Sequence, residues 1–235
     1  MKAGEPLAQL RAQANPANAA GMARFGIRGA EVLGISIPVL RKLAKEAGRD
    51  HALAQQLWAS GVHEARILAG MVADPAQMTE AAAEEWVAAF DSWDLCDQVC
   101  MNLLRHCPFA YAKSAEWSGR EEELVKRAGF ALMAALAQGD KQAGDDAFAS
   151  FLPVIEREAG DDRPMVRKAV NWALRQIGKR DLALNKQAVK AAERVRGQGS
   201  RSARWIAGDA LRELRSEAVQ GRLRQARPRP ASRAG

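Results

Sequence analysis

Short runs of apolar residues, each interrupted by polar positions, follow one another along the chain, and residues that favour helix starts precede them. Ser36 and Pro38 come before the run 39–44, and Asp50 comes before the run that ends at Trp58. The side chains of Ser and Asp accept hydrogen bonds from the first amides of a helix, and proline fits its first turn. The pattern therefore predicts helices that begin after Ser36 and after Asp50.

Comparable residues divide the rest of the chain. Asp74 and Pro75 predict the start of a helix that carries Trp86 and Phe90. Glycine commonly follows the last turn of a helix, because it adopts the left-handed conformation that other residues avoid. About a dozen helices of roughly ten to eighteen residues result, joined by connectors too short to be domain linkers. Their ends are expected at Gly48, Gly61, Gly139, Gly160 and Gly197.

The composition favours an all-α fold. Thr79 is the sole threonine and Tyr111 the sole tyrosine, whereas alanine, leucine, glutamine and arginine recur throughout. Successive helices of this length can form a bundle, an orthogonal array or a solenoid. The spacing of the tryptophan-bearing segments 57–58, 85–86 and 93 is compatible with degenerate repeats of two helices each. We favour a curved solenoid, or superhelix, of such helical pairs, with a groove along its concave face.

The hydrophobic fraction and the C-terminal composition bound the domain organisation. Hydrophobic residues make up 48% of the 235-residue chain, which is enough for a continuous core. We therefore expect one α-helical domain over residues 1–217. The stretch 222–230 contains two prolines and several arginines but no acid, which is typical of a disordered segment. We expect a disordered basic tail over residues 218–235.

Membrane and metal functions are not indicated. No stretch approaches eighteen uncharged apolar residues, and the first residues lack the apolar run of a secretion signal. We expect a cytoplasmic protein, associated with the nucleoid if bacterial, that binds no membrane. Cys96, Cys100 and Cys107 are an odd number and indicate reduced thiols. Together with His106 they suggest a zinc site, but they lack the paired short spacings of such sites, so no metal is expected.

The charge is divided unevenly along the chain. Residues 163–235 carry 19 Lys and Arg against 5 Asp and Glu, whereas residues 1–162 carry 16 against 23. Such asymmetry favours binding to nucleic acid or to an anionic membrane over a merely solvated surface. The arginines of the tail would add non-specific attraction for phosphate.

Two tryptophans at helical spacing from charged residues point to a binding site. Trp93 lies four positions before Asp97, and Trp172 lies four after Lys168 and three before Arg175. Residues three or four apart share one face of a helix. The pattern is typical of a concave site that holds an anionic polymer and places one negative charge within it.

Several of these segments together resemble a known family. The chain is similar to the AlkD-type DNA alkylation-repair glycosylases, which are built from HEAT-like helical repeats. The resemblance covers about 160 residues. It rests on Phe25-Gly26-Ile27, on Leu33-Gly34-Ile35 and the residues up to Arg41, on His63-Glu64-Ala65-Arg66, on Trp93-Asp94-Leu95-Cys96-Asp97, on Lys126-Arg127, and on the helix from Arg167 to Arg175.

The resemblance implies a catalytic site. It implies that Trp93 supplies an aromatic wall and Asp97 the catalytic carboxylate, and that Arg127 and Trp172 complete the site. Family members hold the lesion without swinging it into a base pocket, in contrast to the usual flipping mode. The family often has a second aromatic residue before the tryptophan, where this chain has Ser92.

The implied partner is duplex DNA that carries N3- or N7-alkylated purines, and the implied activity is that of a monofunctional glycosylase. We expect a monomer that needs no cofactor. A lyase is disfavoured, because no lysine of the matched helices falls at the proposed sugar site. The alternative is a catalytically silent HEAT-like module that binds DNA or a protein partner through the same groove.

Basic residues would hold the DNA backbone without reading its sequence. For the adjacent pair Lys126 and Arg127, the alternative is a merely solvated face. Only one of two adjacent helical residues can face the groove, and we expect Arg127 to do so and to contact a phosphate. The further phosphate contacts are expected from Arg163, Lys168, Arg175, Lys179 and Arg180, with Arg201 and Arg204 as additional candidates.

The remaining aromatic, acidic and histidine residues are expected to be structural. Asp94 is expected to cap a helix or to pair, and His63-Glu64 to serve helix packing or a surface pair. His51 is expected near a helix start without a catalytic role, and the role of Trp205 is left open. Core positions are expected for Trp58, Trp86 and Trp117.

Overall fold

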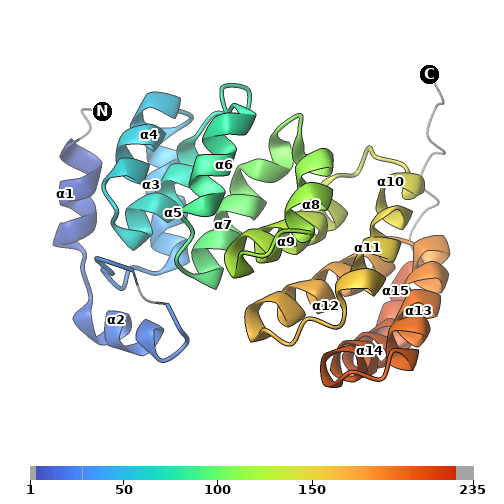
Figure 1. The fold of residues 1–235 in the computed structure, drawn as a ribbon. Coiled ribbons are helices and arrows are strands. Elements are labelled where there is room, and N and C mark those ends of the chain that lie inside the picture. The colour runs from blue at the N-terminus through green and yellow to red at the C-terminus, as the bar shows by residue number, and fades with distance from the viewer. Residues whose placement is uncertain (1–3, 28, 226–235) are drawn as a thin grey trace. The chain divides into compact units, whose positions relative to one another are not determined.

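The computed structural model describes residues 4–27 and 29–225. The chain divides into two compact units, Met1–Ala110 and Tyr111–Gly235. The described residues are helical apart from turns, loops and one isolated bridge between Glu31 and Val62. The first unit contains α1 (Gly4–Ala12), α2 (Pro16–Ala23), α3 (Ile37–Ala47), α4 (His51–Ala59), α5 (His63–Val72), α6 (Glu80–Ala88), α7 (Trp93–Asn102) and the short 3-10 helix η1 (Leu104–His106) (Figure 1).

The second unit contains the remaining helices. Its first helix, α8, begins at the boundary between the units. The elements are α8 (Ala110–Ser118), α9 (Glu123–Gly139), α10 (Asp145–Ala149), α11 (Phe151–Glu158), α12 (Pro164–Gly178), α13 (Leu182–Gly197), α14 (Arg201–Leu214) and α15 (Glu217–Gln225).

Most expected helix boundaries are confirmed. Ser36 is the N-cap of α3, and Asp50 caps α4 by accepting a hydrogen bond from the amide of Leu53. The expected start at Asp74 is wrong. Its carboxylate accepts from the amide of Ala76 in a turn, and α6 is capped by Thr79 instead. The five glycines expected to end helices all lie at the last residue of a helix or within two residues after it.

The first unit is built on α5, which packs against α3, α4 and α7. One helix of each pair thus packs on its counterpart in the next pair, as expected for helical repeats. Trp58 and Trp86 stack with their ring centroids 4.0 Å apart and are buried, as expected. Helices α3, α5 and α7 succeed one another in Figure 1.

The segment before α3 is anchored by Glu64. Its buried carboxylate accepts hydrogen bonds from the backbone amides of Leu33, Gly34 and Ile35 at 2.6 to 3.2 Å. Gly34 has a φ of 76°, and a Cβ there would lie 2.2 Å from the carbonyl oxygen of Asn15. Only glycine fits this position, so the Leu-Gly-Ile motif is a structural requirement of the first unit.

The second unit is built around α9, whose residues from Val125 to Ala137 are all buried. Helix α12 packs along α9 and also contacts α13 and α14, which pack on each other. Trp117 of α8 is fully buried, as expected.

The expected start of the tail needs correction, whereas the expectation of one domain over residues 1–217 stays a prediction beside the two compact units of the structure. The tail was expected to begin at residue 218, but 217–225 form α15, which contacts α13 and α14 and buries Val219 and Leu223. These two apolar residues lie four apart and give the helix a packing face. The rest of the expected tail, 226–235, lies outside the described residues.

The three cysteines are free thiols and all are buried. Burial raises the pKa of the Cys107 thiol to about 11, which keeps it protonated at neutral pH. Among the helices within 4–27 and 29–225, none has the length and apolar character needed to span a bilayer.

Candidate functional site

The start of α7 brings together Trp93 and Asp97. Trp93 is the first residue of the helix, and Asp97 lies one turn later on the same face. The indole Nε1 donates a hydrogen bond to the carbonyl oxygen of Phe25 at 3.0 Å, so the loop after α2 holds the ring. Asp97 is 9% exposed and the indole is half-buried. An aromatic ring and a carboxylate are thereby placed on one face of a helix rather than on a loop.

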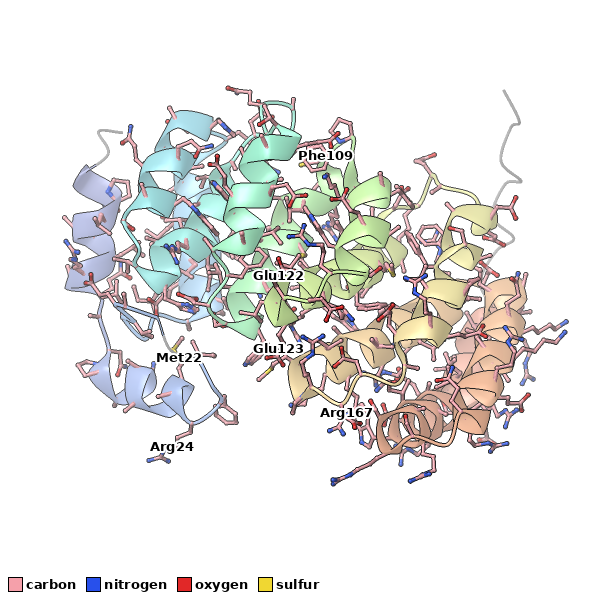
Figure 2. The ribbon with its side chains drawn as sticks, viewed as in Figure 1. Met22, Arg24, Phe109, Glu122, Glu123 and Arg167 are labelled. Carbon is pink, nitrogen blue, oxygen red and sulfur yellow. The ribbon has the colours of Figure 1, made fainter. Side chains whose placement is uncertain are left out.

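Phe25 is part of this face, although its local pattern indicates no role. It is 72% exposed, the highest value among the large hydrophobic residues described. Arg24 beside it is also exposed and projects from the end of α2 (Figure 2). Phe25 lies within one of the family motifs, so that motif is the only sequence feature that marks it.

Asp94 is a structural residue, as expected. Its Oδ2 lies 2.9 Å from Nε2 of His63, the first residue of α5. His63 is buried, so the pair links two packed helices and is not a surface pair. The remaining polar atoms, Nδ1 of His63 and Oδ1 of Asp94, are buried without a hydrogen-bond partner.

Burial and neighbouring groups shift the pKa values of both His63 and Asp94. Burial opposes the charged form of His63, but the hydrogen bond to Asp94 and the nearby carboxylates of Glu64 and Asp91 outweigh it and raise its pKa. Burial also opposes the charge of Asp94, yet the hydrogen bonds from His63 and Ser92 lower its pKa. The carboxylate of Asp94 is therefore used to position the first turn of α7 against α5.

Arg127 and Lys126 lie near the start of α9, and both are buried. The Nη1 of Arg127 donates to the carbonyl oxygen of Met165 in the first turn of α12 at 2.6 Å. Neither residue lies on the solvated face that was the alternative for this pair, and Lys126 pairs with Glu158 at 2.9 Å and with Asp161 at 3.5 Å. Helix α9 is buried all round, so a cation here needs a carboxylate or carbonyl partner. A phosphate contact by Arg127 stays a prediction.

Trp172 lies on α12 and is half-buried. When the side-chain amide of Gln176 is oriented so that its oxygen and nitrogen both form hydrogen bonds, the oxygen accepts one from the indole Nε1 of Trp172 at 3.1 Å. Trp172 and Arg127 belong to the second unit, whereas Trp93 and Asp97 belong to the first. Each unit orders its own pair, and the convergence of the two pairs in one groove stays a prediction.

Three of the expected phosphate contacts are already paired with carboxylates. Arg163 binds Asp161 at 2.5 Å. Arg175 and Lys179 both bind Glu213 at 2.7 Å. A phosphate would have to compete with these carboxylates, which lowers the net attraction that each cation contributes.

Arg180 was expected to contact DNA, but its position is inconsistent with that role. It is buried and donates to the carbonyl oxygens of Ala137 and Asp140 at 2.7 and 2.8 Å. Its guanidinium also lies 3.5 Å from the centroid of the Phe148 ring. Arg180 therefore joins the end of α9 to α10 and α12.

Lys168, Arg201 and Arg204 are exposed, and within the described parts of the chain none of them has a carboxylate partner. Arg167 is half-buried and also has no carboxylate partner among the described residues, and its guanidinium carbon lies 4.8 Å from the ring centroid of Trp205. Arg167 is labelled on α12 in Figure 2. Trp205, whose role was left open, is 40% exposed on α14 and is therefore a surface residue. The helical spacing of Arg201, Arg204 and Trp205 is a sequence pattern that marks this surface.

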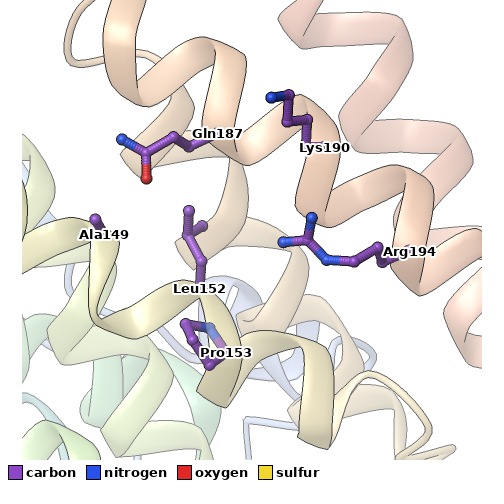
Figure 3. A pocket seen from close by; sticks show the side chains of 6 residues that line it. All are labelled: Ala149, Leu152, Pro153, Gln187, Lys190 and Arg194. Carbon is purple, nitrogen blue, oxygen red and sulfur yellow. The ribbon is translucent and has the colours of Figure 1, made fainter.

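Two hollows lie in the second unit. One has a volume of about 290 Å³ and is lined by α10, α11 and α13, including Leu152, Lys190 and Arg194 (Figure 3). Arg194 is held there by a two-point ion pair with Glu156. The other hollow, of about 320 Å³, is lined by residues that include Lys179, Arg180 and Arg222. Neither hollow contains an expected catalytic residue.

The fold is that of the HEAT-like repeat DNA glycosylases. A solved structure described as "a new family of proteins related to the HEAT-like repeat DNA glycosylases with affinity for branched DNA structures" superposes with a TM-score of 0.80 at 20% identity. The match covers 95% of this chain and 96% of that chain. The expected all-α class with HEAT-like helical repeats is therefore confirmed. A designed armadillo repeat protein in complex with a peptide gives a TM-score of 0.37 at 15% identity, over 79% of this chain and 88% of that one.

The family is shown by sequence. Residues 7–214 match the model of the family described as DNA alkylation repair enzyme, and the chain belongs to this family. The resemblance drawn from the motifs is thereby confirmed. No curated protein matches the chain.

Proposed function

We propose that this chain is a monofunctional DNA glycosylase that hydrolyses the N-glycosidic bond of cationic N3- or N7-alkylated purines in duplex DNA. The observation that carries the proposal is the α7 face, where the Asp97 carboxylate lies one turn from Trp93 in a member of the DNA alkylation repair family. A carboxylate repels phosphate, so a surface that only bound DNA would gain nothing from it.

The substrate's own charge explains why so small a site suffices. Alkylation at N3 or N7 leaves the purine positively charged, so the base departs as a neutral molecule and needs no general acid. As the bond breaks, positive charge develops on the deoxyribose, as in the oxocarbenium-like transition state of glycoside hydrolysis. The group required from the protein is therefore an anion beside the sugar.

Asp97 is proposed to be that anion. A carboxylate about 4 Å from the developing charge, at an effective dielectric constant near 20, stabilises it by roughly 4 kcal/mol. At about 1.4 kcal/mol per tenfold, this amounts to a rate acceleration on the order of a thousandfold. Such help is effective for an already labile bond and far too small for an unmodified nucleotide. Asp97 would also be placed to orient the attacking water.

The other proposed roles are binding roles. Trp93 and Trp172 would present indole faces to the sugar and its developing charge, each contributing about 0.5 to 2 kcal/mol. Arg127 would contact a flanking phosphate from the second unit. Lys168, Arg201 and Arg204 remain proposed backbone contacts, since each is exposed and without a carboxylate partner among the residues described. Arg163, Arg175 and Lys179 would contribute less, because their charges are already paired.

Single-turnover release of 7-methylguanine from methylated duplex DNA tests the proposal. We expect wild type to release the base well above the rate of spontaneous depurination and Asp97→Asn to lose about a thousandfold in rate. Asp91→Asn is a matched control, because Asp91 is an exposed acid just before the same helix. No release by wild type would overturn the enzyme proposal, whereas equal release by wild type and Asp97→Asn would overturn the role of Asp97.

A second candidate is a catalytically silent DNA-binding module. The solved structure with the same fold is described as having affinity for branched DNA, which makes binding without hydrolysis a specific alternative. It predicts tight binding of unmodified DNA, no base release, and no effect of Asp97→Asn other than slightly stronger binding.

A further inference from the structure

The exposed side of α14 carries an aromatic residue among cations. Arg201, Arg204, Trp205 and Gly208 are all exposed and recur at intervals of three and four. They therefore form one stripe along the first half of the helix. Arg167, from the neighbouring helix α12, places its guanidinium carbon 4.8 Å from the Trp205 ring centroid and adds a third arginine.

The cations of this stripe are poorly placed for stability. Arg201 is the first residue of α14, and the first turn of this helix contains no acid. The N-terminus of a helix is the positive end of its macrodipole, so a cation there is unfavourable. Neither Arg167 nor Arg201 has a carboxylate partner in the described part of the chain, whereas Arg175 and Lys179 on and after α12 do. A cation at a helix N-terminus with no acid in the first turn breaks a local rule of stability, which is typical of a functional surface.

The nearby acids are already engaged. Asp209 lies four residues after Trp205, and its carboxylate accepts from Asn171 at 2.7 Å and from Arg212 at 2.6 Å. It also lies 3.4 Å from Arg175. Asp162, in the loop before α12, is exposed and adds one negative charge to this end of the unit. The three arginines, with the exposed Lys168 next to Arg167 on α12, thus leave an excess of positive charge around the indole.

Gly208 leaves space next to Trp205. A Cβ at this position would meet no atom within 4 Å, so packing does not require glycine here. Glycine within a helix costs about 1 kcal/mol relative to alanine. Side chains on a helix lean toward its N-terminus, so a residue at 208 would lean toward the indole. Glycine keeps that side of the ring open to a ligand.

We propose that Trp205 and the surrounding cations bind an unpaired nucleotide of DNA. The base would stack on the exposed indole, and the adjoining phosphates would contact Arg167, Lys168, Arg201 and Arg204. An exposed aromatic ring in a cationic groove is the arrangement that binds single strands without sequence preference. In duplex DNA the base faces are covered by their neighbours, so the surface suits an overhang, a gap or a branch. The proposal rests on the DNA-binding part of the proposed function and not on its chemistry.

Fluorescence anisotropy with unmodified DNA tests it. The probes are a labelled blunt duplex and the same duplex with a single-stranded oligo(dT) overhang. We expect wild type to prefer the overhang form. Trp205→Ala should weaken binding of the overhang form at least about tenfold and leave the blunt duplex unchanged. Trp205→Phe, which keeps an aromatic face, should retain part of the preference.

Leu182→Ala is the matched control, because Leu182 is also 40% exposed on the second unit but lies on α13. It should change neither affinity. The double variant Arg201→Gln, Arg204→Gln should reduce the salt dependence of oligo(dT) binding by about 0.7 for each lost phosphate contact. Thermal melting of every variant establishes that it is folded.

The outcomes separate this proposal from the glycosylase proposal. An equal loss for both probes in Trp205→Ala would assign Trp205 to duplex binding, and no loss for either would assign it to packing against Arg167. Either result would overturn the proposal that an unpaired base stacks on Trp205. Neither depends on base release, and a protein that releases no alkylated base would still show the Trp205-dependent preference.

Discussion

The carboxylates of the first unit and the cations of the second are used in the same two ways. In the first unit, Glu64 and Asp94 are engaged in structural hydrogen bonds, whereas Asp97, although buried, shares a face with Trp93. In the second unit, Arg180 is buried against carbonyl oxygens, whereas Arg204 lies exposed on α14. Formal charge therefore overstates the charge that a ligand meets. What matters is how the fold engages each charge.

The largest effect is expected where a charge is wholly structural. Glu64→Gln replaces one acceptor oxygen by an amide donor and leaves at least one of the buried amides of residues 33–35 without an acceptor. We expect a loss of about 3 kcal/mol in the free energy of unfolding, measured with urea. The exposed Glu46→Gln is the control and should change it little. Equal losses in the two variants would mean that the Glu64 anchor is not structural.

A somewhat smaller loss is expected from the corresponding cation of the second unit. Arg180→Gln removes three hydrogen bonds to carbonyl oxygens and the contact with Phe148. We expect about 2 kcal/mol less stability and unchanged DNA affinity at temperatures where the variant is folded. Arg204→Gln should instead leave the stability nearly unchanged and lower the DNA affinity. A lower DNA affinity of folded Arg180→Gln would restore Arg180 as a DNA contact.

Two lysines allow the DNA contribution of an exposed, unpaired cation to be compared with that of a cation already paired with a carboxylate. Lys168 on α12 is exposed, and Lys179 just after the same helix pairs with Glu213. Lys168→Gln should lower the slope of log affinity against log salt for duplex DNA by about 0.9, the value of one phosphate contact. Lys179→Gln should lower it by less. Equal slopes in the two variants would show that the Glu213 pairing does not mask Lys179.

The smallest effect is expected in the pH dependence of the His63–Asp94 pair. The pKa of His63 is raised in the folded protein, because Asp94, Glu64 and Asp91 outweigh the effect of burial. Its stabilising effect is therefore complete below the ordinary histidine pKa of about 6.5 and is lost as the pH rises through the raised value. We expect the melting temperature of wild type to fall over that range and that of His63→Asn to stay flat. Parallel curves would rule out the charged pair.

For Asp94 the direction is reversed. Its pKa is lowered by the hydrogen bonds from His63 and Ser92, although burial opposes this. Its contribution is complete above the ordinary aspartate pKa of about 3.9 and is lost as the pH falls through the lowered value. The pair is thus most stabilising between the ordinary aspartate pKa of about 3.9 and the ordinary histidine pKa of about 6.5. The stability of Asp94→Asn should therefore fall less steeply than that of wild type as the pH is lowered.

Much of the helical fold could be predicted from local residues. Ser36 and Asp50 occupy the N-cap positions where expected, and Asp50 accepts a hydrogen bond from an amide only three residues away. The failure at Asp74 has the same origin. Asp followed by Pro also forms a turn, and Asp74 caps that turn while Thr79 caps the helix. Local chemistry offers both outcomes, and packing of the segment decides between them.

The candidate site could be predicted in part. The Trp93–Asp97 spacing placed both residues on one face of α7, because four residues are about one turn. The expected phosphate contacts were predicted from residue type and position alone. That prediction was weaker, because it did not include the partners that the cations have in the fold. Arg180 is buried, Arg175 and Lys179 share one carboxylate, and Arg167 was omitted although it lies against Trp205. Nothing within a few residues of these positions indicates those partners.

The sequence by itself determined the all-α class, most helix boundaries, the family and the acid on the α7 face, because each depends on neighbours within one or two turns or on motifs in order. The tertiary structure decided which charges are available to a ligand. Arg180 meets a carbonyl oxygen 43 residues away, and Lys179 meets a carboxylate 34 residues away. A charge is neutralised by whatever folding brings within a few ångströms, and that distance has no counterpart in sequence separation.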